Sequence, residues 1–371
     1  RLQDTGFRQY GLETKLAARL ARNQHVSVYY QRGVQDQVRA YKDLLGGLGR
    51  LQSAFDPQIL NWFHARYEKL GLGFVDSLTG TFSVNSQADG SLRQNLRASD
   101  PVTRDWSRVN AYGYSLQATT NWRDRVLAAF GGDIYDERIA STRELAAAGG
   151  SAPQAARPLY PDGSTYRTFA LFGQSSAELT RRLSAQVGGR LTGVHFHAQP
   201  DSRFQVPGSS QWFRDVTFNT SLRWQAAPFL GLHALVSRGF RAPNLSDLGA
   251  IGLNDLGYEI PAAAALSSGA LLSTDAGESA LSKSIPLAGL RSESLLNYEA
   301  GVRFTTRRLY GRVQAFDAEL SDPIVRRTLL FPAGSAPREL TGLPVTPLPP
   351  TAAQQKQGVV AVATGVDPRA V

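Results

Sequence analysis

The stretch that decides the fold is Val216–Ala226, which reads VTFNTSLRWQA. Its even positions are mostly apolar or aromatic and its odd positions are polar: Val216, Phe218, Thr220, Leu222, Trp224 and Ala226 against Thr217, Asn219, Ser221, Arg223 and Gln225. A period of two residues predicts a β-strand with one apolar face and one polar face. The run is longer than the ~5–6 residues of an ordinary soluble strand.

The same alternation recurs along the chain, most clearly in Tyr112–Trp122 and Leu296–Phe304. It predicts about twelve strands, over residues 7–19, 24–34, 61–70, 75–87, 109–122, 125–140, 165–179, 183–197, 213–226, 229–240, 293–306 and 309–322. The connections between them are alternately short and long. The long ones are expected at 35–60, 88–108, 141–164, 198–212 and 241–292, and a Pro-rich tail follows at 323–371.

Alternating short and long connections are typical of an outer-membrane barrel, in which the periplasmic turns are short and the external loops are long. Tyr112 and Tyr114 near one end of a strand and Trp122 at its other end suit the two aromatic girdles of such a barrel. The sequence therefore predicts an all-β chain that is part of a large antiparallel transmembrane β-barrel in the bacterial outer membrane. A half-buried strand in a large soluble sheet is the alternative.

The predicted topology places both ends of the chain on the external side, because the first strand leads into a short turn and the last strand leaves one. A finished barrel of this kind has an even number of strands and both termini inside, so at least one strand is expected to be missing at each end. Residue 1 is Arg and the chain contains no Met, which also suggests an internal segment. We therefore expect residues 1–371 to form a partial barrel domain, with 241–292 as a long external loop and 323–371 as a truncated external loop or tail.

Composition excludes several classes of protein. The chain has no Cys, so disulfide frameworks, thiolate metal sites and Cys nucleophiles are excluded. Apolar stretches fall short of the ~18–20 residues of a membrane helix, and no catalytic motif is present, so an enzyme is not expected. The net charge of +9 raises nucleic acid or anionic lipid as a partner. Arginines that flank the predicted short turns favour lipid headgroups over nucleic acid: Arg19, Arg22, Arg123, Arg125, Arg181, Arg182, Arg307 and Arg308.

Four segments resemble the TonB-dependent outer-membrane receptors: SRGFRAPNLSDL at 237–248, SESLLNYEAGVR at 292–303, GGDIYDERI at 131–139 and GGRL at 188–191. The resemblance implies a barrel of about 22 strands, of which about twelve are present. It also implies an N-terminal plug domain that carries the energy-coupling box for the TonB complex. Neither the plug domain nor the energy-coupling box is visible in this chain, so the chain alone is not expected to perform active transport.

The resemblance implies a ligand-gated transporter for an iron chelate or a similar large nutrient. A ferric siderophore is the default cargo, because it is the commonest in the family. Haem is disfavoured, since loop 241–292 has no His and no Asn-Pro-Asn-Leu segment follows the Phe-Arg-Ala-Pro motif. No cofactor is expected. A passive porin or an adhesin-type barrel is the alternative function.

Five residues on or beside predicted loops are candidates for contact with cargo: Arg241, Tyr258, Arg291, Trp106 and Trp212. Arg241 follows a strand and precedes Pro243, so it is expected at the mouth of the barrel, where it can attract an anionic chelate or simply pair with a carboxylate. Aromatic residues can stack on a planar ligand, although Trp212 and Phe213 suit the aromatic girdle equally well. The small-residue segment 262–282 leaves open whether loop 241–292 is functional or disordered.

Two further clusters have plainer explanations. His195 and His197 share one face of a strand end but lack a third metal ligand, so no metal site is expected. Asp133, Asp136 and Glu137 are interpreted as lumen-facing carboxylates that pair with Arg.

Overall fold

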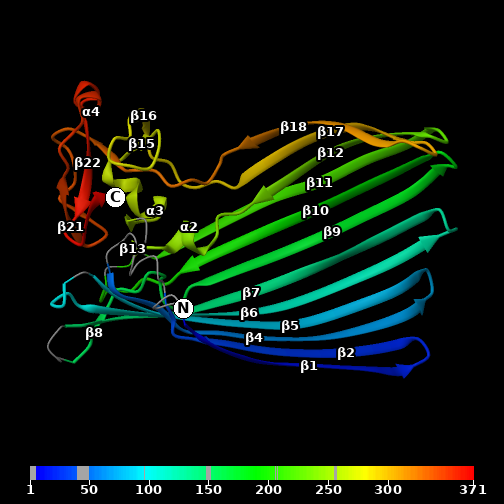
Figure 1. The fold of residues 1–371 in the computed structure, drawn as a ribbon, viewed down its shortest axis with the longest axis horizontal. Coiled ribbons are helices and arrows are strands. Elements are labelled where there is room, and N and C mark those ends of the chain that lie inside the picture. The colour runs from blue at the N-terminus through cyan, green and yellow to red at the C-terminus, as the bar shows by residue number, and fades with distance from the viewer. Residues whose placement is uncertain are drawn as a thin grey trace.

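A computed structural model describes residues 6–39, 50–95, 97–147, 152–204, 206, 208–254 and 257–371. Its main feature is a 14-stranded antiparallel sheet (Figure 1). The long strands follow one another in chain order: β1 (Arg8–Ala21), β2 (Gln24–Asp36), β4 (Arg50–Leu72), β5 (Val75–Asn95), β6 (Val102–Trp122), β7 (Val126–Ala146), β9 (Thr165–Thr180), β10 (Leu183–Ala198), β11 (Ser209–Ala227), β12 (Leu230–Arg241), β17 (Glu293–Thr305) and β18 (Tyr310–Ser321). Two short strands, β3 (Val38–Arg39) and β8 (Gln154–Ala156), pair with β4 and β7.

Every range predicted as a strand contains one, and the alternation of short turns and longer connections is confirmed. Strands β4 to β7 are longer than predicted, so the connections expected at 35–60, 88–108 and 141–164 are shorter than predicted. Parts of these three connections, residues 40–49, 96 and 148–151, lie outside the described residues. The extra strand length was missed because polar residues occupy both faces there, as in the sequence NSQADGSLRQN of residues 85–95.

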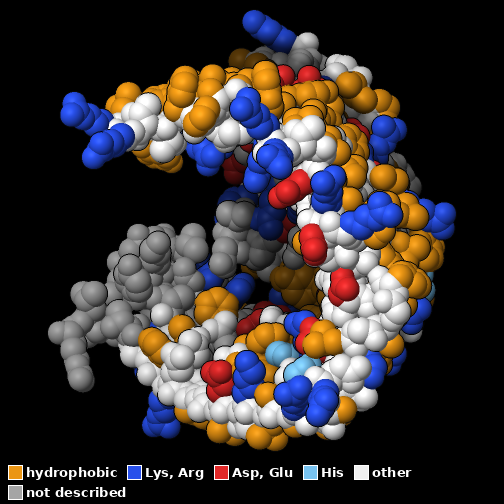
Figure 2. Space-filling model, turned by 90° about the vertical axis from the view of Figure 1, so that its right-hand side faces the viewer, with side chains coloured by type: hydrophobic (Ala, Val, Ile, Leu, Met, Phe, Trp, Pro, Cys, Tyr) orange, Lys and Arg blue, Asp and Glu red, His pale blue; other side chains and the backbone are white. Residues whose placement is uncertain are grey.

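The two faces of the sheet differ as the alternation predicts. Val216, Leu222 and Trp224 of β11 point outward and each is about half exposed. Figure 2 looks into the hollow of the curved sheet, where charged and other polar side chains prevail, whereas hydrophobic side chains follow the outer rim. This arrangement suits a sheet that contacts lipid outside and water inside.

The long strands form an open curved sheet (Figure 2). Along the described residues, β1 and β18 are its two edges and each pairs with a single neighbour. No helix among the described residues is long and apolar enough to cross a membrane.

The segments 242–292 and 323–371 fold together at the end of the sheet opposite the short turns (Figure 1), and we call them the cap. The cap holds a 7-stranded sheet, a separate hairpin and four short helical segments. Its strands are β13 (Gly252–Asn254), β14 (Gly257–Glu259), β15 (Leu271–Ser273), β16 (Ser282–Pro286), β19 (Leu330–Pro332), β20 (Glu339–Leu340), β21 (Leu343–Pro347), β22 (Val359–Thr364) and β23 (Asp367–Ala370). Its helical segments are α2 (Leu245–Gly249), α3 (Ala262–Ala265), η1 (Leu266–Ser268) and α4 (Ala352–Gln357).

The core of the cap joins residues that are far apart in the sequence. Tyr258 and Ala265 from the first segment pack with Phe331, Leu340 and Val362 from the second. Strand β15 pairs with β19 across the same junction. The expected loop and tail are therefore one folded unit that rests on the end of the sheet.

Candidate functional site

A cavity of about 1110 Å³ lies between the two segments of the cap. One wall is formed by β14 and by the stretch from Lys283 to Arg291, and the other by residues 322–329 and the last residues of the chain. Its lining mixes apolar side chains, such as Ile285 and Leu287, with charged ones. The connection from β18 to β19 lines the cavity along most of its length, and its last residue, Leu329, also belongs to the core of the cap.

The cavity wall carries more cations than its carboxylates neutralise. Arg326 pairs with Glu259, with Nη2 2.9 Å from Oε2. Lys283, Arg291 and Arg327 also line the cavity, and within the described part of the chain these three have no ion-pair partner. Two lining carboxylates, Glu278 and Asp322, are likewise without an ion-pair partner among the described residues. The unpaired side chains therefore leave a net positive charge in the cavity.

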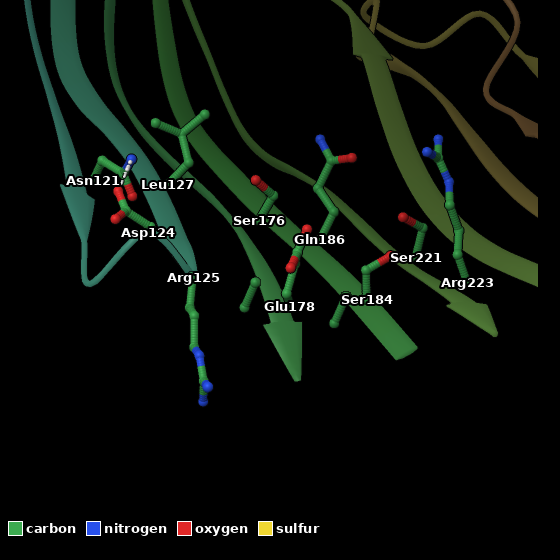
Figure 3. Close-up of a pocket in the computed structure, with 12 residues that line it drawn as sticks. Asn121, Asp124, Arg125, Leu127, Ser176, Glu178, Ser184, Gln186, Ser221 and Arg223 are labelled. Atoms are coloured by element: carbon green, nitrogen blue, oxygen red, sulfur yellow. Dashed lines mark hydrogen bonds between the residues drawn. The ribbon is translucent and has the colours of Figure 1, made fainter. Parts of the chain in front are cut away.

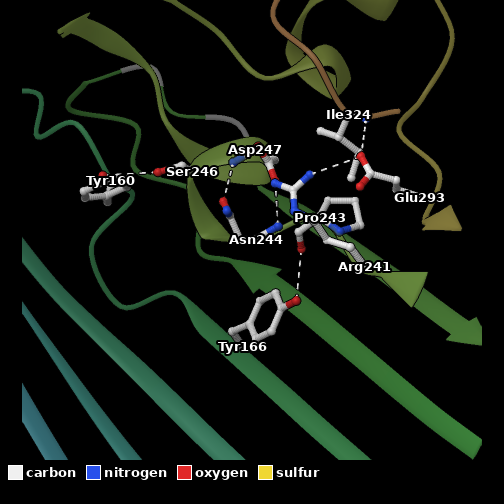
Figure 4. Close-up of polar contacts among 9 residues, drawn as sticks. All are labelled: Tyr160, Tyr166, Arg241, Pro243, Asn244, Ser246, Asp247, Glu293 and Ile324. Atoms are coloured by element: carbon white, nitrogen blue, oxygen red, sulfur yellow. Dashed lines mark hydrogen bonds and ion pairs between the residues drawn. The ribbon is translucent and has the colours of Figure 1, made fainter. Parts of the chain in front are cut away.

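Arg241 stands beside this cavity and is held by two carboxylates (Figure 4). Its Nη2 lies 2.7 Å from Oδ2 of Asp247 and its Nη1 lies 3.7 Å from Oε2 of Glu293. Asp247 also accepts a hydrogen bond from the backbone N–H of Asn244, which caps helix α2. The structure thus favours the interpretation in which Arg241 pairs with neighbouring carboxylates over the one in which it attracts an anionic chelate. The paired guanidinium group holds the turn between β12 and α2.

Tyr258 is buried and takes a structural part in the cap. Its hydroxyl accepts a hydrogen bond from the Arg157 guanidinium and lies 3.4 Å from Oγ1 of Thr341. Its ring belongs to the core of the cap, although one edge reaches the cavity together with the exposed Arg291. Of the five candidates, the structure therefore brings Tyr258 and Arg291 to one cavity, with Arg241 next to them through Asp247.

The family model for the TonB-dependent receptor-like β-barrel matches residues 3–363, which is nearly the whole chain. The chain belongs to the TonB-dependent receptor family. Its members reside in the bacterial outer membrane, so the short turns face the periplasm and the cap faces the exterior.

Solved structures support the fold of this receptor barrel. The chain is similar to the copper transporter OprC, with a TM-score of 0.61, 12% identity, and coverage of 91% of this chain and 48% of that one. It is also similar to the ferric citrate transporter FecA, with a TM-score of 0.60, 10% identity and coverage of 88% and 47%. The HasR haemophore receptor of Serratia marcescens gives a TM-score of 0.59, 13% identity and coverage of 86% and 46%. The chain spans about half the length of these structures. A comparison with curated proteins gave no match.

Trp106 and Trp212 lie apart from the cap cavity. Both were placed on or beside loops, but the structure puts Trp106 in β6 and Trp212 in β11. Both tryptophans face outward, because each is an even number of residues from an exposed apolar residue of its own strand, Leu116 in β6 and Val216 in β11. The guanidinium carbon of Arg108 lies over the Trp106 ring, 5.1 Å from its centroid. The Trp212 residue is 53% exposed.

Two of the three carboxylates of the acidic cluster in the barrel wall form the expected ion pairs with arginine. The third, Glu137, has no ion-pair partner among the described residues, so the expected pairing is wrong for it. Asp133 accepts two hydrogen bonds from Arg190, at 2.8 and 2.9 Å. Asp136 pairs with Arg138 and Arg167, which confirms that arginines neutralise it. Its expected lumen-facing position is wrong, because it lies directly across from the outward-facing Tyr112. The described residues hold no group of three or more His, Asp or Glu side chains that could hold a metal ion.

A second hollow, of about 310 Å³, lies on the lumen side of the barrel near the short turns (Figure 3). Asp124, Glu178, Arg125 and Arg223 give it mixed charge. It is separated from the cap by most of the strand length (Figure 1), so the two hollows cannot hold one ligand together.

Two cations of the cap cavity, Lys283 and Arg327, are not among the candidates that the sequence indicates. Both lie in segments without a clear periodic pattern, and Arg327 belongs to the tail that was treated as a truncated loop. The available signal was the adjacent pair Arg326–Arg327 just beyond the Asp-Pro step at 322–323.

Proposed function

We propose that this receptor barrel is the ligand-gated part of an uptake system for an iron chelate, such as a ferric siderophore, or a similarly large nutrient. The TonB complex energises uptake through a plug domain outside this chain. The barrel acts as a transporter and not as an enzyme. The observation that carries the proposal is the cationic cavity of the cap, which stands at the external mouth of a barrel of this family.

The size of the cavity favours a large cargo. Pockets for small ligands usually measure ~300–1,000 Å³, and the cap cavity exceeds that range at about 1110 Å³. The structurally similar proteins include a copper transporter and a ferric citrate transporter, which supports a metal complex as the class of cargo.

The chemistry of the wall suits an anionic chelate. Lys283, Arg291 and Arg327 offer cations whose charges no neighbour neutralises within the described part of the chain. Ile285 and Leu287 offer apolar surface for the organic part of the ligand. Charge-assisted hydrogen bonds to a carboxylate or catecholate oxygen are stronger than neutral ones, so these cations would dominate affinity.

The test uses the full-length receptor that contains this chain, expressed on cells that lack other siderophore receptors. Binding of a panel of radiolabelled ferric siderophores is measured for the parent and for the double variant Lys283→Ala/Arg291→Ala. We expect affinity for an anionic member of the panel to fall by ~1–3 kcal/mol per lost charge-assisted bond. The matched control is Lys356→Ala, which removes an exposed cation from helix α4 away from the cavity.

An unchanged affinity in the double variant, at equal surface expression, would contradict the cavity as the cargo site. A strain without TonB separates transport from passive flow. Binding should persist in that strain and uptake should stop, whereas uptake that continues would favour the passive porin.

A further inference from the structure

One row of side chains crosses the outer face of the barrel wall near its external end. Directly paired residues of adjacent strands bring together Tyr112 of β6, Asp136 of β7, Arg167 of β9, His195 of β10 and Trp212 of β11. We call these five residues the rim row. Residues that pair directly across antiparallel strands lie on the same face of the sheet, so the whole rim row faces outward with Tyr112 and Trp212.

The apolar band lies immediately below the rim row. Four residues further along each strand, towards the short turns, is a row that contains Leu116, Leu171, Leu191 and Val216, all more than half exposed. Four residues correspond to ~13 Å along a strand. This exposed apolar row faces the hydrocarbon. Because the strands are tilted, the members of a row differ in depth, and the rim row crosses the region where the headgroups of the outer leaflet begin.

The rim row and its neighbours carry an excess of positive charge. Two arginines share one carboxylate, since Asp136 pairs with Arg138 at 2.8 Å and with Arg167 at 2.9 Å. Both arginine side chains remain exposed to solvent, at 63% for Arg138 and 46% for Arg167. Arg214, from the adjacent outward-facing row, adds a third cation beside Trp212. Because three arginines share this surface with the single carboxylate of Asp136, some of their N–H groups remain available to bind an anion.

An aromatic stack forms the other half of the surface. The Trp212 and His195 rings are stacked with centroids 4.3 Å apart, and Trp212 also stacks with Phe169 at 6.3 Å. Tyr and Trp side chains are favoured at the membrane interface because they combine an apolar body with a polar edge. The stack therefore supplies a platform for the glycerol or sugar part of a lipid, beside the arginines that would bind its phosphate.

We propose that the rim row, with Arg138 and Arg214, binds the phosphorylated headgroup of a lipid in the outer leaflet. Arginine forks match the geometry of phosphate oxygens, and the acyl chains of the same lipid would continue down the apolar band. This site lies on the outer wall, away from the cap cavity, so it concerns a lipid partner and not the cargo.

The test uses the purified full-length receptor in a neutral detergent, with lipid retention counted by native mass spectrometry. The probes are dioleoylphosphatidic acid, which carries a phosphate monoester, and dioleoylphosphatidylcholine. We expect Arg138→Gln/Arg167→Gln to reduce retention of phosphatidic acid at least tenfold, because each lost charge-assisted bond is worth about that factor. Retention of phosphatidylcholine should fall much less, because its zwitterionic headgroup has no net charge. Arg138→Lys/Arg167→Lys should keep much of the retention because the charge remains.

The matched control is Arg338→Gln/Lys356→Gln, which removes two exposed cations from the cap, away from the barrel wall. Its retention of phosphatidic acid should equal that of the parent. Heat-modifiable migration on gels confirms that each variant is folded, and Arg214→Gln, which loses only the contact with Trp212, serves if the double variant fails to fold. Soluble glycerol 3-phosphate should not displace the lipid, because it lacks the acyl chains.

Three results would overturn the proposal. One is equal retention of phosphatidic acid by the parent and by the folded variants that lose rim arginines. Another is an equal loss in the control variant, and the third is displacement by glycerol 3-phosphate alone. Binding of ferric siderophores should be the same in all these variants, so the cargo proposal stands or falls separately.

Discussion

Gly301 shows how a single residue fits two strands of the barrel together. It lies directly across from His233 of β12, and a Cβ atom at this position would stand 2.3 Å from Cε1 of His233 and 2.9 Å from the carbonyl oxygen of Val313. The backbone oxygen cannot move aside as a side chain can, so any larger residue would separate β17 from a neighbour.

We therefore expect Gly301→Ala to destabilise the folded barrel by ~1–3 kcal/mol, the usual cost of overpacking. Urea unfolding of the full-length receptor in lipid vesicles measures the change. Gly239→Ala is the matched control, because a Cβ atom there would meet no atom within 4 Å. Equal stability of the two variants would show that the contacts at Gly301 are not tight.

Asp367 links the stability of the cap to pH. Burial alone would raise the pKa of this carboxyl, but hydrogen bonds donated by the side chain and backbone of Arg369 outweigh it and lower the pKa below its ordinary value. A lowered pKa in the folded state contributes stability that is fully present above the unfolded-state pKa of ~3.9 and is lost as the pH falls through the lower folded-state value.

We expect the cap to become sensitive to an acid-active protease such as pepsin as the pH falls below ~4. Asp367→Asn should make the cap more sensitive at neutral pH, measured with a neutral protease, and should flatten the acid-dependent part of the profile. The variant Asp275→Asn removes an exposed carboxylate of the same cap for comparison. A profile that is identical for the parent and Asp367→Asn would contradict this role of the ion pair.

The candidate site was only partly predictable at the residue scale. The position of Arg241 at the end of β12 followed from the strand pattern and from Pro243, and pairing with a carboxylate was one of its two interpretations. The burial of Tyr258 was not predictable, because its partners Phe331, Leu340 and Val362 come from a segment more than 70 residues away whose strands show no clear alternation.

Among the strands, the alternation in β11 predicts that one face contacts lipid and the other faces the lumen. Leu222 lies on the outward face and is about half exposed, whereas its neighbour Ser221 lines the hollow near the short turns. Replacing Leu222 by Arg should destabilise the barrel in bilayers by ~2–4 kcal/mol, because a cation on the lipid face loses its hydration. Ser221→Arg introduces the same side chain on the lumen face and should cost much less. Equal folding of both variants into vesicles, measured by urea titration, would contradict the assignment of faces.

The twelve long strands could be predicted because the membrane imposes apolar residues at every second position of each strand. That constraint ends at the membrane surface, so the outer halves of β4 and β5 could not be recognised. The cap could not be predicted either, since its small sheet is stabilised by contacts between two distant segments and its strands are mostly three to six residues long.

At the scale of the whole molecule, the sheet has two open edges. Strand β1 pairs only with β2 and strand β18 only with β17 along the described residues. Unpaired edges are costly in a lipid environment and promote aggregation. Residues 1–371 expressed alone should therefore aggregate in detergent instead of forming a heat-modifiable, protease-resistant barrel, whereas the full-length receptor should form one. A monodisperse barrel from residues 1–371 would contradict the open sheet.

The sheet spans the outer membrane with its cap outside and its short turns in the periplasm, and this orientation can be measured directly. The absence of Cys from the chain makes single-cysteine labelling clean. Lys283→Cys on the cap and Arg307→Cys at the turn between β17 and β18 are introduced into the full-length receptor, and intact cells are treated with a membrane-impermeant maleimide. This orientation predicts labelling of Lys283→Cys on intact cells and labelling of Arg307→Cys only after the outer membrane is permeabilised. Labelling of Arg307→Cys on intact cells, with protection of Lys283→Cys, would contradict it.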